Sequence, residues 1–216
     1  MHVTQQFNQS PMKKIFLLLL MLSISPALIQ AQHVEITPFG GYVFPVTWNG
    51  SNGSIYFHGN AQYGGMVNIG VSRVIDVDLI YNRIDTKADP AIVGVTFDQL
   101  PLSINYFMVG FTKNFRINDM VSPFLGLNMG ACLLAPKSSE YYDYWFFAAG
   151  IQGGVKFYFS KVVGLRLQAQ VMMPVQGQGF YFYYGSYGGG SGYTFSSPLV
   201  DFGFTGGLIF RIGQIR

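Results

Sequence analysis

Strict alternation of apolar and polar side chains is the feature that most constrains how this chain can fold. In residues 164–173, GLRLQAQVMM, Leu165 and Leu167 alternate with Arg166 and Gln168. A period of two is typical of a β-strand with one apolar and one polar face. Eight segments alternate in this way, each long enough to cross a bilayer as a tilted strand of about 9–11 residues. They are residues 34–44, 61–72, 75–84, 101–113, 123–134, 147–160, 164–173 and 199–212.

The connections between these segments alternate in length. The short ones are residues 73–74, 114–122 and 161–163, and the long ones are residues 45–60, 85–100, 135–146 and 174–198. Short turns at one end and long loops at the other are typical of an up-and-down membrane barrel. Most prolines fall at strand ends, where a missing N–H costs least. We place Pro90 in a loop, and Pro38 marks a bulge or bend unless the first strand starts later.

Composition argues against an ordinary soluble domain. The 216 residues form one predicted domain in which 11% of residues are charged, whereas a soluble domain carries about a quarter. A net charge of +3 without a dense Lys/Arg cluster argues against nucleic-acid binding. Cys132 is the only cysteine, which excludes an intrachain disulfide and a cysteine metal cluster. No metal-ligand spacing, nucleotide-binding loop or nucleophile motif appears, so we expect no cofactor.

The two faces of the predicted strands differ in size as well as polarity. One face is small and polar, for example Gln62, Asn68, Gly126 and Gln152, and the other is large and apolar. The second face carries Tyr63, Val67, Ile69, Val71, Val77, Leu79, Tyr81, Ile104, Tyr106, Leu125, Leu127, Ile151, Val155, Phe157, Phe202, Phe204 and Leu208. A soluble lipocalin-like barrel would need many Lys, Glu and Thr residues outside. The opposite arrangement, with small polar residues in a narrow lumen and apolar residues facing lipid, fits better.

The N-terminus predicts export. Residues 12–31 carry Lys13 and Lys14, then an apolar run, and end at the small residue Ala31, as in a cleaved secretory signal peptide. A short membrane anchor is the alternative, but the apolar run is too short to span a bilayer. Residues 1–11 are expected to be an upstream extension, and residues 32–216 to form the barrel domain.

The segments GGVKFYFS, KVV and GLRLQAQ and the closing FGFTGGLIFRI resemble the small outer-membrane β-barrels of Gram-negative bacteria. The similar groups are the OmpA-type transmembrane domain, OmpX-like barrels and the opacity or porin family. The resemblance implies an all-β fold, a single eight-stranded antiparallel up-and-down transmembrane barrel. It also implies a cell outer-membrane location, contact with outer-membrane lipids and insertion by the barrel assembly machinery. Phe210 resembles the late aromatic of the closing strand in such proteins, although RIGQIR follows it.

Charged residues at the short-turn ends of the strands predict a cluster inside the lumen. Seven residues are assigned an inward parity: Glu35, Asp76, Asp78, Lys113, Lys156, Arg166 and Arg211. Pairing of the first and last strands brings Glu35 near Arg211, and Arg166 is expected to bridge toward Asp76 or Asp78. The alternative is that Arg166 extends to periplasmic water.

The outer loops carry the leading functional hypothesis, a structural or surface-interaction role with adhesion or ligand contact. The Gly- and Tyr-rich loop offers a contact surface made of Tyr181, Tyr183, Tyr184, Tyr187 and Tyr193. An interfacial aromatic girdle is the alternative explanation for aromatics close to the strands. No catalytic residue is assigned. Two other functions remain open: a lipid-modifying enzyme using His58, which lacks a neighbouring Ser and acid in the sequence, and transport of a small solute.

Overall fold

The computed structural model describes residues 33–50, 53–92, 95–96, 100–137, 143–175, 181–184, 191–194 and 199–214. The proposed signal peptide and upstream extension lie outside these residues. Every regular element within them is a β-strand. None of the described residues belongs to a helix long and apolar enough to cross a membrane.

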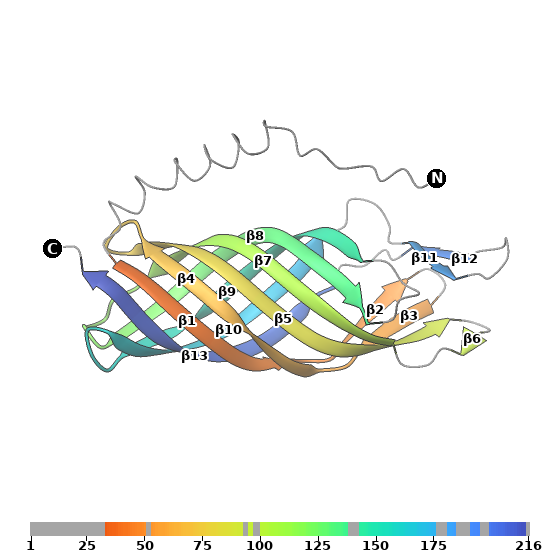
Figure 1. Cartoon of the computed structure of the whole chain (residues 1–216), viewed down its shortest axis with the longest axis horizontal. Coiled ribbons are helices and arrows are strands. Elements are labelled where there is room, and N and C mark those ends of the chain that lie inside the picture. The colour runs from red at the N-terminus through yellow and green to blue at the C-terminus, as the bar shows by residue number, and fades with distance from the viewer. Residues whose placement is uncertain are drawn as a thin grey trace, which may run out of the picture.

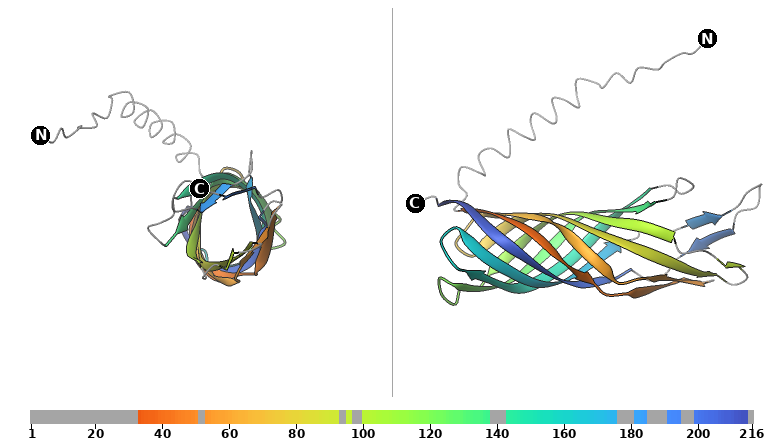
Figure 2. Two further views of the ribbon diagram at one scale, coloured as in Figure 1. Left: turned by 90° about the vertical axis from the view of Figure 1, so that its right-hand side faces the viewer. Right: turned by 60° about the horizontal axis from the view of Figure 1, so that its bottom comes forward.

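Eight long strands close into an antiparallel barrel, which confirms the predicted fold (Figures 1 and 2). The strands are β1 (His33–Val43), β4 (Asn60–Gly70), β5 (Ile75–Ile92), β7 (Leu100–Asn114), β8 (Val121–Pro136), β9 (Tyr144–Tyr158), β10 (Val163–Val175) and β13 (Asp201–Gln214). The spatial order is β5-β4-β1-β13-β10-β9-β8-β7, and pairing of β5 with β7 completes the circle. Each long strand therefore has a hydrogen-bonded partner on both sides.

Pairing of the first and last strands occurs as expected. The ladder between β1 and β13 sets Glu35 opposite Arg211 and Gly40 opposite Gly206. Pro38 causes no bulge, because the ladder between β1 and β4 runs through the pair Pro38 and Gly65 without a shift. The register of β1 shifts between His33 and Val34, and its ladder with β13 has no pair at Thr37 and Pro38.

The two ends of the barrel are unequal. The start of β1 and the end of β13 lie at one end, which we call the turn end because it also holds the short connections 71–74, 115–120 and 159–162. The other, the loop end, carries additional strands that the sequence analysis had assigned to loops: β2 (Val46–Gly50), β3 (Gly53–Phe57), β6 (Val95–Thr96), β11 (Tyr181–Tyr184) and β12 (Ser191–Thr194).

The loop-end half of β5 shows that the expected loop position of Pro90 was wrong. This strand continues to Ile92 because β3 pairs with its extension, and Pro90 lies opposite Ile55 rather than in a loop. On the other edge of β5, the described ladders show no pair at positions 89 and 90. A proline there removes no ladder hydrogen bond on that edge.

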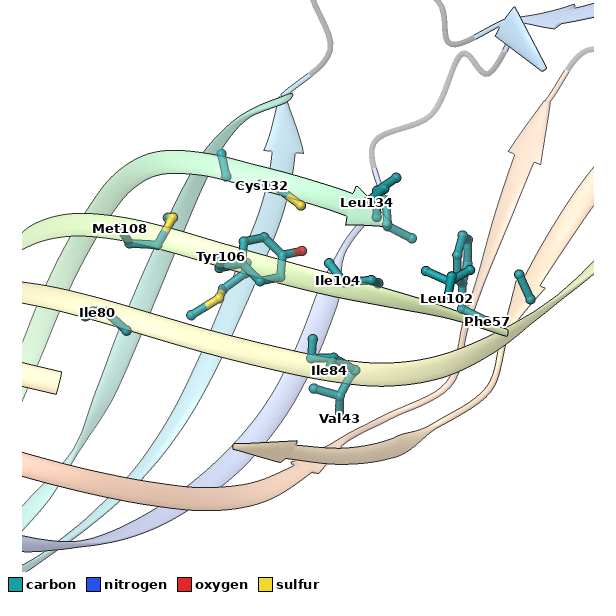
Figure 3. Close-up of a cluster of buried hydrophobic side chains, with 14 of the residues drawn as sticks. Val43, Phe57, Ile80, Ile84, Leu102, Ile104, Tyr106, Met108, Cys132 and Leu134 are labelled. Carbon is teal, nitrogen blue, oxygen red and sulfur yellow. The ribbon is translucent and has the colours of Figure 1, made fainter. Parts of the chain in front are cut away.

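Inside the barrel, the two halves differ in polarity. The turn half carries the predicted polar and small side chains, such as Asn68, Asp78 and Gln152, all buried. Figure 3 shows a different filling in the loop half, where large apolar side chains point inward. They include Val43, Phe57, Ile80, Ile84, Leu102, Ile104, Tyr106, Met108 and Leu134.

Strand β7 shows the change within one strand. Its inward residues are Ile104 and Tyr106 in the loop half, but Thr112 in the turn half. Its outward residues change in the opposite sense, from Asn105 to the exposed Phe111. Placing Ile104 and Tyr106 on the lipid face was therefore wrong, because the apolar face of this strand turns inward toward the loop end.

Close approach between strands requires glycine at Gly64, and this gives a matched test with its neighbour. A Cβ atom at Gly64 would lie 2.0 Å from the backbone oxygen of Tyr81, whereas a Cβ at Gly65 meets nothing within 4 Å. We expect Gly64→Ala to lower the free energy of unfolding by about 1–3 kcal/mol. Gly65→Ala should change it by less than about 0.5 kcal/mol. Urea unfolding in detergent measures both, and equal losses would contradict the steric explanation.

Candidate functional site

Lys156 on β9 is the centre of the charged part of the lumen. Its Nζ lies 3.0 Å from Oε2 of Glu35 on β1 and 3.0 Å from Oδ2 of Asp76 on β5. All three side chains are 1% exposed or less. The single ammonium group thereby connects three strands that are not neighbours in the barrel wall.

Further side chains donate hydrogen bonds to the carboxylates of Glu35 and Asp76. Arg211 donates from Nη2 to Oε1 of Glu35 at 2.7 Å, and the Tyr158 hydroxyl donates to the same oxygen at 2.9 Å. Asn114 donates from Nδ2 to Oδ2 of Asp76 at 2.8 Å. Four of the seven predicted charges, Glu35, Asp76, Lys156 and Arg211, therefore meet in one buried cluster, which we call the lumen plug.

His33 adds a third group of the metal-ligating type. Its Nε2 lies 3.4 Å from Oδ1 of Asp76 and 3.9 Å from Oε1 of Glu35. Ligand atoms of these three residues lie within 4.8 Å of one another. Lys156 and Arg211 already neutralise both carboxylates, however, so the group lacks the excess negative charge that attracts a divalent cation. We assign no metal site here.

Asp78 is held by neutral donors. Asn68 donates from Nδ2 to Oδ1 at 2.5 Å, and Gln152 donates from Nε2 to Oδ2 at 3.0 Å. The Thr112 hydroxyl makes a further, short hydrogen bond to Oδ2. Asp78 thus belongs to a polar layer next to the lumen plug, but forms no ion pair within 4 Å in the part of the chain that the structure describes.

The predicted bridge from Arg166 to Asp76 or Asp78 is wrong. Arg166 donates from Nε to Oε1 of Gln168 at 2.6 Å, and its guanidinium carbon lies 3.9 Å from the ring centroid of Phe124. Nη1 and Nη2 have no hydrogen-bond partner among the described residues. The alternative of exposure to water also fails, because Arg166 is 2% exposed. The inward ring of Phe124 provides a cation–π contact in place of an ion pair.

Lys113 lies outside the cluster, so its inward assignment was also wrong. It is exposed on the outer face of β7, with Nζ 5.4 Å from the ring centroid of Phe115. The error has the same origin as that for Tyr106. The apolar residues of the loop half of β7 were expected to face lipid, but they face inward. Applying the expected orientation to the whole strand placed Lys113 in the lumen, whereas it lies on the outer face.

A chain of amides continues from Arg166 toward the loop end. Gln168 donates to Gln170 at 3.0 Å, and Gln170 donates to Gln62 on β4 at 2.8 Å. Asn82 on β5 donates to the same Gln62 oxygen at 3.0 Å. Sequence reasoning placed these glutamines inside but gave no sign of this cross-lumen network, because it depends on the register between strands far apart in sequence.

A buried carboxylate lies within the apolar half of the lumen. The Tyr106 hydroxyl donates a short hydrogen bond to Asp201, and both residues are almost fully buried. Cys132 is buried directly opposite Tyr106 in the ladder between β7 and β8. Tyr106 was missed as a lumen residue, although a tyrosine hydroxyl that finds a buried partner is common.

His58 has an acidic partner that the sequence did not reveal. Its Nε2 lies 2.7 Å from Oδ2 of Asp89, and its ring packs edge-on against Tyr56 at 4.9 Å. No hydroxyl group of the described residues hydrogen-bonds to the His58 ring. A nucleophile positioned by this histidine is therefore missing from the described part of the chain, and we do not propose the enzyme alternative.

The predicted tyrosine surface is described only in its backbone. Strands β11 and β12 form a hairpin in which Tyr181 pairs with Thr194 and Tyr184 with Ser191. Tyr183 pairs with Gly192, and Phe182 with Tyr193. Tyr187 lies outside the described residues. The loop-contact role of these tyrosines remains a prediction.

Comparison with known proteins gives the fold alone. No protein-family model and no curated protein matches the sequence. Among solved structures, the outer membrane protein OprG from Pseudomonas aeruginosa is 11% identical, with a TM-score of 0.56 over 85% of this chain and 97% of that one. Neisserial surface protein A is 11% identical, with a TM-score of 0.54 over 86% and 98% of the two chains. Outer membrane protein AlkL, solved in DMPC lipid bilayers, is 12% identical, with a TM-score of 0.51 over 86% and 93%. The chain has the fold of these small outer-membrane barrels.

If the lumen plug is a closely paired cluster, removing its cation alone should destabilise the protein more than removing the cation together with one carboxylate. Lys156→Met leaves two buried carboxylates short of a cation, so we expect a loss of about 3–5 kcal/mol in the free energy of unfolding. Adding Asp76→Asn should recover part of that loss, since one unpaired charge disappears. The control is Lys161→Met in the exposed turn, which should be nearly neutral. Urea unfolding of the unmodified protein, the two single variants, the double variant and the control decides, and strictly additive losses from Lys156→Met and Asp76→Asn would argue against the plug.

Proposed function

We propose that this chain is an integral protein of the Gram-negative outer membrane, with a structural or surface-contact role at its loop end. The belt of large apolar side chains on the outside of the barrel carries this proposal. Phe111, Leu127 and Met129 are 60%, 64% and 60% exposed. Exposed apolar belts of this kind are characteristic of lipid-facing barrel walls and are avoided by soluble monomers.

The interior supports the same placement. Buried charges and amides fill the turn half of the lumen, where they are shielded from hydrocarbon by the closed wall. Every strand edge of the barrel is paired, as a sheet in lipid requires. The similarity to outer-membrane barrels in fold agrees with the proposal, although their individual activities are not transferred to this chain.

Surface contact is proposed for the loop end because the chain adds structure there. The hairpin of β2 and β3 extends the sheet along β5, and the hairpin of β11 and β12 lies at the same end (Figure 1). The turn end has only short connections. A protein whose role was confined to spanning the membrane would not need these additional strands at the loop end.

Accessibility in intact cells tests the orientation. A peptide tag inserted at Gly188 should bind antibody on unpermeabilised cells, whereas the same tag at Lys161 in the short turn should not. Both should bind after permeabilisation, which controls for expression. Staining of the Lys161 tag on intact cells, with none for Gly188, would reverse the assignment of the two ends.

The filled lumen argues against a wide channel, and planar bilayers test this. Eight-stranded barrels leave an interior that side chains roughly fill, whereas aqueous pores occur at about 16 strands. We expect no large, stable conductance steps from the purified barrel. The conductance of Lys156→Met, which removes the centre of the lumen plug, is recorded in the same way and compared with that of the unmodified protein. Stable steps from the unmodified protein would favour the small-solute transport alternative over the surface-contact role.

A further inference from the structure

A polar patch interrupts the outer wall of the barrel near the loop end. It consists of Tyr63 on β4, Arg83 and Asp85 on β5, and Lys137 just after β8, and we call it the rim patch. Tyr63 and Arg83 face each other in the ladder between β4 and β5. The patch therefore gathers side chains from separate strands onto one part of the outer surface.

One carboxylate organises the rim patch. Asp85 accepts hydrogen bonds from the Tyr63 hydroxyl at 2.9 Å and from Nη2 of Arg83 at 3.0 Å, and Nζ of Lys137 lies 3.1 Å from its Oδ1. Two cations share a single anion, so the patch has a net charge of +1. Arg83 and Lys137 remain 34% and 49% exposed, which leaves part of each cationic group open to the outside.

The depth of the rim patch follows from its neighbours on the wall. On the turn side of the patch, Tyr81, Phe107 and Trp145 form a row with ring centroids 5.2 and 6.0 Å apart. Beyond this row the outward residues are apolar, such as Leu79 and Val109. Aromatic rows of this kind mark the interface between hydrocarbon and headgroups in membrane barrels. The rim patch lies on the headgroup side of that interface.

The patch is confined to one side of the barrel. On the adjoining part of the wall, next to β4, β1 and β13 carry Tyr42, Phe44, Phe202 and Phe204 outward at the loop end, and their rings contact one another at centroid distances of 5.2 to 5.9 Å. The charges of the rim patch thus lie on the part of the wall that runs from β4 and β5 to the end of β8, and not on β1 or β13. A local contact site explains this one-sided placement better than a general requirement for polar residues at the interface.

We propose that the rim patch is a docking site for the headgroup of a phosphorylated glycolipid. This inference rests on the proposed outer-membrane placement. Arg83 and Lys137 suit a phosphate group, because charge-assisted hydrogen bonds to phosphate are among the strongest in proteins. The central Asp85 and the Tyr63 hydroxyl suit sugar hydroxyls, which can donate to a carboxylate. A phosphatidic acid headgroup has no sugar hydroxyls to donate and would meet repulsion from Asp85.

Titration with two lipids tests the proposal. The full-length barrel in detergent is titrated with diphosphoryl lipid A and, separately, with phosphatidic acid, and native mass spectrometry counts the bound lipid. The unmodified protein should bind diphosphoryl lipid A more tightly. Arg83→Gln combined with Lys137→Gln should weaken that binding by about tenfold or more, since each loses a charge-assisted contact. Lys137→Gln alone changes only a half-exposed side chain, so it tests binding without risk to folding.

The matched control is Lys113→Gln, which removes an outward lysine on a neighbouring strand at the turn end. It should leave lipid A binding unchanged. Equal binding of both lipids, or unaltered lipid A binding by the double variant and by Lys137→Gln, overturns the proposal. Heat-dependent migration of the unmodified protein is measured alongside. A barrel that keeps this migration but fails to prefer lipid A contradicts the docking site alone, whereas failure of the Gly188 tag to bind antibody on intact cells contradicts the membrane placement on which it rests.

Discussion

The ammonium group of Lys156 holds together strands that backbone hydrogen bonds cannot join. β1, β5 and β9 are not adjacent in the wall, yet Glu35, Asp76 and Lys156 meet inside the turn half of the lumen. Burying three charges is favourable only when each is closely paired and hydrogen-bonded. Arg211, Tyr158 and Asn114 provide those additional contacts, and the polar layers around Asp78 and Gln62 extend them along the lumen.

The polarity of the inner and outer faces changes along the barrel axis, and the two faces change in opposite senses. In the turn half, charges lie inside and phenylalanine and leucine outside. In the loop half of β5 and β7, Ile84 and Ile104 lie inside, while Arg83 and Asp85 lie outside. The loop half of this wall has the amphipathic pattern of a water-soluble barrel, which agrees with a proposed position beyond the hydrocarbon.

Sequence alternation was sufficient to predict the strand number, the antiparallel order, the pairing of β1 with β13 and the polar turn half of the lumen. It failed where one strand changes character, since Ile104 and Tyr106 look lipid-facing to a rule that assigns one apolar face per strand. The same rule misplaced Lys113. The contacts of Arg166 were beyond prediction for another reason: the distance between Phe124 and Arg166 depends on strand stagger around the closed ring, which no local pattern encodes.

The one-sided rim patch has a geometric consequence for the whole molecule. If polar outward residues begin just past Tyr81 on the β5 wall, while aromatic residues continue to the loop end on β1 and β13, the upper edge of the apolar band lies nearer the loop end on the β1–β13 side than on the β5 side. An upper edge that slants around the barrel matches the flat surface of the hydrocarbon only when the barrel leans. The axis is then inclined to the membrane normal, with the β1–β13 wall sunk deeper at the loop end and the extended β5 wall raised above the surface.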